Sequence, residues 1–157
     1  MKEFLRSDFG LWGTYRASPD PRSAPVTLHR DPLLNFTSKD DFPLHGGIPF
    51  VRWEGSLVAP VAGTYSFLGL ASDPSVLSID GNPVTLAANE PSTGHALAKG
   101  PHRIILDFRN TSNFSPAFSF LWKRPGEDRF EVVPASAFHS PPDKILSTRF
   151  KREIFAK

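Results

Sequence analysis

The sequence contains no cysteine and only one methionine among its 157 residues. Without cysteine there are no disulfide frameworks, no thiolate metal sites and no cysteine nucleophiles, although this does not identify a compartment. No run of about 18 apolar residues occurs, so no membrane-spanning segment is expected. Residues 1–6 also lack the apolar core of a signal peptide.

Helical periodicity is equally scarce before residue 143, whereas Phe (14), Pro (16) and Gly (11) are abundant. Short alternating apolar segments between Pro- and Gly-rich turns are typical of an antiparallel β-sandwich or barrel. The pair Asp80-Gly81 predicts a type I′ hairpin turn. Residues 35–49 are mostly polar and predict a long surface connection. The main expected strands are residues 10–15, 26–29, 50–57, 64–70, 76–79, 84–86, 102–108, 117–122 and 130–133.

The net charge of +2 is unevenly distributed along the chain. Residues 143–157 hold five basic and two acidic residues, a net of +3, so the rest of the chain carries −1. The body therefore offers no basic surface for nucleic acid. The sequence divides into a lead-in (1–9), a β domain (10–139), and a linker with a basic amphipathic tail (140–157). That tail is expected to pack on this domain or a neighbouring one, with membrane-surface binding as an alternative.

Seven short motifs, in order and with compatible spacing, resemble the PA14 family, a β-rich module of bacterial toxins, glycosidases and adhesins. Any one of them alone is weak, and together they cover about residues 10–139. The hairpin from Val51 to Phe67 matches best. The others are Gly10–Tyr15, Asp31-Pro32 with Asn35-Phe36, Ser72-Asp73 with Ile79-Asp80-Gly81, Gly100 with His102 and Ile104, Leu121-Trp122 with Pro125-Gly126, and Val133–Ser136.

The resemblance implies a non-catalytic antiparallel β-sandwich that binds carbohydrate as an accessory domain of a larger exported or cell-surface protein. In the family's adhesins, two adjacent aspartates joined by a cis peptide hold Ca²⁺, which binds sugar hydroxyls. Here Asp73 is retained but Pro74 replaces the second aspartate. No cofactor is therefore expected, since Ca²⁺ requires six to eight oxygen ligands and one carboxylate is lost. Ca²⁺ binding is the alternative, because an Asp-Pro bond can still be cis.

The ligand-binding candidates are polar residues of the Asp73 turn and of the loop that strand order places opposite it, residues 109–116. Asp73 is also the one candidate metal ligand. Amides and carboxylates suit sugar hydroxyls because they form directional hydrogen bonds, but the same residue types also favour ordinary solvated turns. The candidates are Ser72, Asp73, Asp80, Asn110 and Asn113.

Other features favour structural roles. Trp53 and Trp122 are expected in the core with their indole N–H groups bonded, and Arg52 and Glu54 are expected to form surface or cross-strand ion pairs. The histidines lack zinc-site spacing, and no nucleophile elbow, Walker or dinucleotide motif occurs. An enzyme is therefore not expected. The alternative function is a structural spacer or protein-interaction domain that has lost its sugar site.

Overall fold

The structure, a computed structural model, describes residues 9–18, 20, 22–38, 41–43, 50–71, 73–110 and 117–140. Within these ranges the chain forms twelve β-strands, and the short 3₁₀-helix η2 (Ala135–Ala137) precedes the last of them. None of the described residues forms a helix long and apolar enough to cross a membrane. The strands are β1 (Leu11–Arg16), β2 (Pro25–Asp31), β3 (Asn35–Phe36), β4 (Phe50–Ala59), β5 (Gly63–Ala71), β6 (Ser75–Ile79), β7 (Asn82–Leu86), β8 (His95–Leu97), β9 (Gly100–Arg109), β10 (Phe118–Lys123), β11 (Glu131–Val132) and β12 (Phe138–His139).

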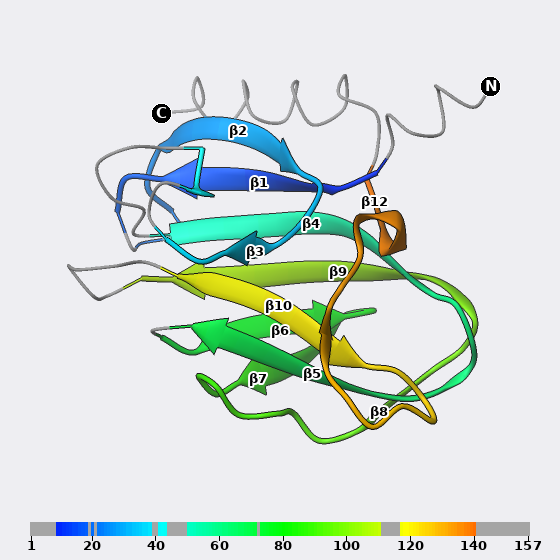
Figure 1. Cartoon of the computed structure of the whole chain (residues 1–157). Helices are drawn as coiled ribbons and strands as arrows, with labels where there is room; N and C mark the ends of the chain where they lie inside the picture. The colour runs from blue at the N-terminus through cyan, green and yellow to red at the C-terminus, as the bar shows by residue number, and fades with distance from the viewer. Residues whose placement is uncertain are drawn as a thin grey trace.

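The described strands assemble into two antiparallel sheets that share one core (Figure 1). The larger sheet has the order β2-β1-β4-β9-β6-β7, with β12 paired to β4. The smaller has the order β11-β10-β5-β8, with β3 paired to β10. The predicted antiparallel β-sandwich is therefore confirmed, and each of the nine main expected strands has a counterpart. The predicted type I′ turn is confirmed by positive φ angles at Asp80 (51°) and Gly81 (86°) between β6 and β7.

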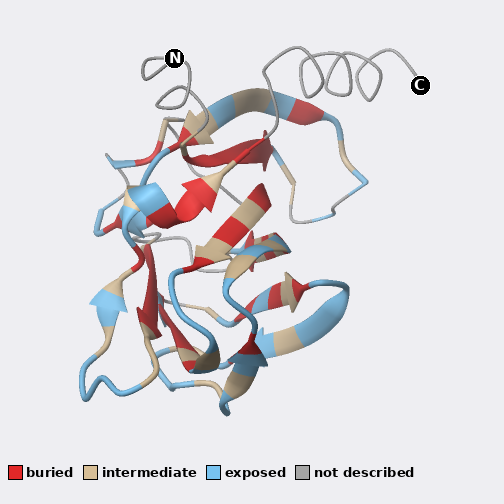
Figure 2. Ribbon diagram, turned by 90° about the vertical axis from the view of Figure 1, so that its right-hand side faces the viewer, coloured by how far each residue is buried: buried red, intermediate tan, exposed pale blue. Residues whose placement is uncertain are grey.

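Most buried residues lie on the strands of the two sheets, and the connections are largely exposed (Figure 2). Trp53 and Trp122 are almost fully buried, as predicted, and donate their indole N–H groups to Asp31 (2.8 Å) and Glu131 (3.2 Å). Trp53 stacks against Phe36 of β3 and against Phe118 of β10. These two strands pair with each other in the smaller sheet. These contacts join the two layers, because Trp53 belongs to the larger sheet.

The stretch 35–49 corrects the prediction of a surface connection, as far as it is described. Phe36 and Phe42 are both buried and stack with ring centroids 4.4 Å apart. Asp41 positions Phe42, because its Oδ2 accepts hydrogen bonds from Thr37 N (2.8 Å) and Ser38 N (3.1 Å). Burying the two rings outweighs the polar character of their neighbours.

A buried carboxylate lies on β2, an edge strand of the larger sheet. Asp31, at the end of β2, is 3% exposed. Its Oδ2 accepts hydrogen bonds from the Tyr15 hydroxyl (2.5 Å) and Trp53 Nε1 (2.8 Å), and its Oδ1 lies 2.7 Å from His29 Nδ1. Burial raises the pKa of Asp31, although these hydrogen bonds oppose the shift. The motif residue that ends β2 is thus a core hydrogen-bond acceptor.

The two ends of the described body are paired with each other. Phe9 forms an antiparallel bridge with His139, and Gly10 N donates to Phe138 O (2.9 Å). β12 in turn pairs with β4 through Phe138 and Leu57. The chain therefore enters and leaves the domain at the same place.

Candidate functional site

Two crossings between the sheets lie at the end of the sandwich where the first candidate residues are found. β5 belongs to the smaller sheet and β6 to the larger, so the intervening turn, residues 71–75, passes from one to the other. The connection from β9 to β10 passes back at the same level, because Ser75 pairs with Phe108 and Ala71 pairs with Phe118. We refer to this place as the Asp73 end of the sandwich.

Asp73 and Asn110 both leave the larger sheet at this end. Asp73 lies two residues before Ser75, and Asn110 lies two residues after its partner Phe108. The antiparallel register therefore directs both side-chain positions to the same end, where each is partly exposed. Strand order alone predicts that these two loops face each other, and for the residues outside the described ranges this stays a prediction.

The turn at Asp73 is held by a residue that sequence reasoning passed over. Asn89 lies in the β7–β8 connection with a φ of 65°. Its Oδ1 accepts from Ala71 N and its Nδ2 donates to Ala71 O, both at 3.1 Å. The side-chain amide thus pairs with the last residue of β5 as a neighbouring peptide would. The available signal was an Asn in a polar loop, the residue type that best tolerates a left-handed backbone after glycine.

Asp80 does not join this group. It follows β6 at its other end, seven residues from Asp73, which corresponds to about 20 Å along an extended strand. There its Oδ2 lies 2.6 Å from His102 Nδ1, and its Oδ1 accepts from Arg103 N at 3.1 Å. Asp80 therefore secures the β6–β7 hairpin against β9, at the opposite end from Asp73.

The Asp80–His102 pair has a defined electrostatic character. His102 contacts Asp80 through Nδ1 and the Ala98 carbonyl through Nε2, at 2.7 Å. Both partners are acceptors, so both ring nitrogens donate when the imidazole is protonated. Burial alone would lower the pKa of His102, but the bonds to the Ala98 carbonyl and Asp80 outweigh it and raise the pKa. The bond from His102 in turn lowers the pKa of Asp80.

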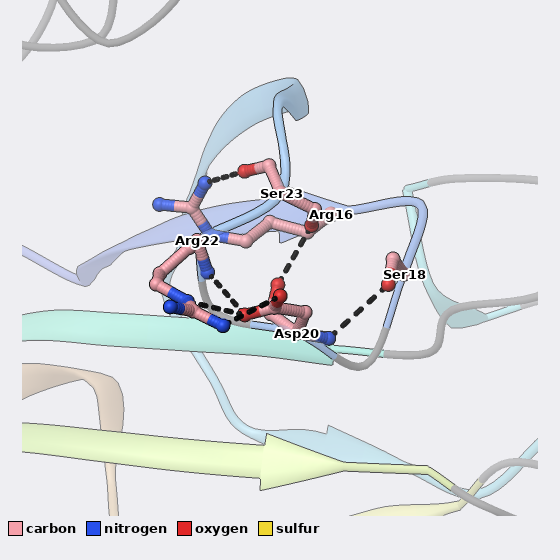
Figure 3. Close-up of polar contacts among 5 residues, drawn as sticks. All are labelled: Arg16, Ser18, Asp20, Arg22 and Ser23. Carbon is pink, nitrogen blue, oxygen red and sulfur yellow. Dashed lines mark hydrogen bonds and ion pairs between the residues drawn. The ribbon is translucent and has the colours of Figure 1, made fainter.

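The β1–β2 loop, residues 17–24, lies at the same end of the larger sheet, because Arg16 pairs with Phe50 and Phe50 with Arg109. Its described polar side chains bond to one another (Figure 3). The Asp20 carboxylate accepts hydrogen bonds from the backbone N (2.9 Å), Nε (3.3 Å) and Nη2 (3.4 Å) of Arg22. Ser23 donates its hydroxyl to Asp20 O (2.7 Å), and Arg16 donates to Ser23 O (2.5 Å). These bonds close the loop on itself, while the Arg22 side chain remains 89% exposed.

A cross-strand row connects this loop to the site. Arg16 pairs with Phe50 and Phe50 pairs with Arg109, so the three side chains share the outer face of the larger sheet. The Arg109 guanidinium lies over the Phe50 ring at 5.9 Å, and Phe50 is only 2% exposed. Arg109 also lies close enough to Asp20 to help lower its pKa, after the larger effect of the hydrogen bonds from Arg22. Arg109 directly precedes Asn110, so the loop reaches the Asp73 end.

The other expected ion pairs also form on this outer face. Arg52 donates Nε and Nη2 to Asp107 at 2.7 and 2.8 Å, a two-point pair across β4 and β9. Glu54 lies 3.8 Å from Arg103 on the same two strands. The prediction that Arg52 and Glu54 form cross-strand ion pairs is confirmed.

The described residues do not fit a calcium site of the adhesin kind. Among them, no three His, Asp or Glu side chains gather closely enough to hold a metal ion. No peptide bond in the described ranges is cis, so Asp73-Pro74 is trans. Ser72 and Asn113 lie outside the described residues, as do the rest of the 111–116 loop and the basic tail 141–157.

No protein-family model and no curated protein sequence matches this chain. Solved structures do. An anti-sigma factor domain-containing protein from Clostridium clariflavum superposes with a TM-score of 0.71 and 22% identity over 85% of this chain. The chain spans only 48% of that protein's length.

Two further similar structures are a sugar-binding domain and an adhesin domain. A PA14 sugar-binding domain from an RTX adhesin matches with a TM-score of 0.65 and 15% identity, over 85% of this chain and 99% of that one. The Epithelial Adhesin 6 A domain from Candida glabrata, solved in complex with Galβ1-3GlcNAc, matches with a TM-score of 0.64 and 15% identity, over 87% and 88%. The chain therefore has the fold of PA14 domains, which confirms the resemblance at the level of the fold.

Proposed function

We propose that this chain is a non-catalytic carbohydrate-binding module, an accessory domain of a larger exported or surface protein. The observation that carries the proposal is the register of β6 and β9, which directs Asp73 and Asn110 to one end of the sandwich. A carboxylate and an amide provide directional acceptors and donors for sugar hydroxyls. The similar sugar-binding PA14 domain and the adhesin domain solved with a disaccharide support the same ligand class.

The site is partly exposed at both residues, so the ligand is held at the surface and competes with water. Affinity for a single sugar is therefore expected to be about millimolar, which corresponds to about −4 kcal/mol. Exported and surface locations follow from the same proposal, since adhesins present their sugar sites outside the cell.

The test is a glycan-array screen of the full chain, followed by titration of the best ligand into variants. Asp73→Ala and Asn110→Ala are expected to lower binding at least ten-fold while leaving the β-sheet circular dichroism unchanged. Asp80→Asn is the matched control, because it changes a carboxylate at the opposite end of β6. Unchanged binding in a folded Asp73→Ala protein would rule out this location, and no binding to any glycan would refute the function.

One observation favours a second candidate, a spacer or protein-interaction domain without a sugar site. Pro74 stands where the adhesins have their second aspartate, and it adds no oxygen side chain for a metal or a hydroxyl. The array separates the two candidates, since a spacer binds no glycan with or without EDTA.

A further inference from the structure

Two arginines border the Asp73 end, and their surroundings indicate the charge of the ligand. Arg22 lies in the β1–β2 loop and Arg109 ends β9, and both are exposed. Arg109 adjoins Asn110 in the chain and shares a cross-strand row with Arg16, which bonds to the loop that carries Arg22. The hydrogen bonds from Arg22 lower the pKa of Asp20, and the charge of Arg109 adds to this effect. The proposed sugar site therefore has a basic border on the side of the larger sheet.

The Arg22 guanidinium is already arranged around a carboxylate. Its Nε faces one oxygen of Asp20 and its Nη2 faces the other, at 3.3 and 3.4 Å (Figure 3). This is the two-point geometry in which arginine binds carboxylates, but both distances exceed those of a strong charge-assisted bond. An exposed ion pair of this kind contributes little to stability. Asp20 thus positions the Arg22 guanidinium, but the pair is weak enough for Arg22 to bind another carboxylate.

The loop backbone does not depend on the Arg22 side chain. Asp20 is held by Arg22 N (2.9 Å), and its carbonyl accepts from Ser23 N (3.0 Å) and Ser23 Oγ (2.7 Å). These bonds remain when the Arg22 side chain moves to another acceptor. The buried Arg16, which donates to Ser23 O, holds the loop against the end of β1.

We propose that the glycan bound at the Asp73 end carries a carboxylate, which Arg22 and Arg109 bind in place of Asp20. The inference rests on the proposed carbohydrate-binding function and specifies its ligand as an acidic sugar of the uronate type. A planar carboxylate suits both guanidinium groups, while the sugar hydroxyls face Asp73 and Asn110. Asp20 acts as an internal competitor for the same position.

The probes are trigalacturonic acid and its full methyl ester, which share one sugar backbone and differ in that each carboxylate of the acid is a neutral methyl ester in the other. Titrated into the full-length protein, the acid is expected to bind about ten-fold tighter than the ester, with a difference that shrinks as salt is added. Arg22→Gln and Arg109→Gln should each bring the two affinities together. Asp20→Asn keeps an acceptor for Arg22 N but removes the competing charge, so it should tighten binding of the acid alone.

Arg103→Gln is the matched control, because it removes the same charge from an exposed arginine beside Asp80, at the other end of the sheet. Its ratio of acid to ester affinity should equal that of the unmodified protein. An equal loss in Arg103→Gln would show diffuse attraction and overturn the inference. Equal affinities for acid and ester would also overturn it and leave the sugar-binding function intact. Absence of binding to both probes and to every array glycan would refute both.

Discussion

Asp31 and Trp53, 22 residues apart in the chain, form a hydrogen bond inside the core, with Trp53 Nε1 donating to Asp31 Oδ2 across 2.8 Å. Gly13, on the strand between them, leaves the space for this bond. A Cβ at Gly13 would lie 2.9 Å from both of the bonded atoms. The bond between the Asp31 carboxylate and the Trp53 indole therefore requires that residue 13 has no side chain.

Gly13→Ala is therefore expected to lower the free energy of unfolding by about 2–4 kcal/mol, through overpacking and loss of the buried bond. Urea denaturation followed by tryptophan fluorescence measures the change. Gly69→Ala is the control, since its Cβ would come no closer than 3.3 Å to a side-chain atom, Phe118 Cε1. Equal costs for the two substitutions would contradict this account of Gly13.

The Asp80–His102 pair predicts a pH optimum of stability. Because the pKa of His102 is raised, this residue contributes to the free energy of unfolding. The contribution is complete below pH 6.5, the ordinary pKa of histidine, and is lost as the pH rises through the raised pKa. The lowered pKa of Asp80 gives a contribution present above 3.8 and lost as the pH falls through the lowered value. The pair should therefore stabilise most between about pH 4 and 6.5.

Urea unfolding of the protein and of His102→Gln across this range tests the prediction. The difference in unfolding free energy should be largest near the middle of the window and should decrease on both sides. Asp80→Asn keeps a residue tolerant of positive φ in the turn. Its free energy of unfolding should depend on pH as weakly as that of His102→Gln. A difference that is constant with pH would exclude the charged pair as its source.

Asn89 offers a test of how the Asp73 turn is held. Asn89→Gly keeps the positive φ but removes both hydrogen bonds to Ala71, and we expect a loss of about 1–2 kcal/mol in stability. Asn89→Ala adds the strain of a left-handed backbone and should cost about 1 kcal/mol more. Thermal unfolding ranks the three proteins. If glycine and asparagine prove equally stable, the amide pairing contributes nothing.

Calcium should not affect this protein. The described residues gather no acidic cluster and Pro74 removes the second carboxylate, so the melting temperature and any glycan binding are expected to be the same in EDTA and in Ca²⁺. Calorimetric titration of Ca²⁺ into the protein gives a direct measurement. A calcium-dependent rise in melting temperature would show that other ligands, such as those of the 111–116 loop, complete a site.

Alternation along the chain predicted the main strands because most of them bury one face, as Val51, Trp53 and Leu57 do on β4. The two-residue strand β3 gave no such signal, since periodicity cannot be detected over Asn35 and Phe36. The polar neighbours of Phe42 then favoured the surface prediction, although side-chain bonds to Asp41 allow the ring to turn inward.

The candidate site was predictable only in part, for a similar reason. Strand order predicts that Asp73 and Asn110 lie at the same end of the sandwich, because the order of antiparallel strands determines the end at which each strand starts and stops. The same motif reasoning grouped Asp80 with them, and the length of β6 separates it. The roles of Asn89 and Arg22 depend on loop conformations in three dimensions, which residue type alone does not determine.

The bridge between Phe9 and His139 has a mechanical consequence. Flanking segments that attach side by side add almost no length to a polypeptide stretched between two anchors. If the domain is part of a longer polypeptide, it would project from the side of that chain, and a pulling force would separate this terminal pairing before it acted on the sheets behind it. Such an attachment suits a domain that presents a surface to its surroundings better than one that sets a distance.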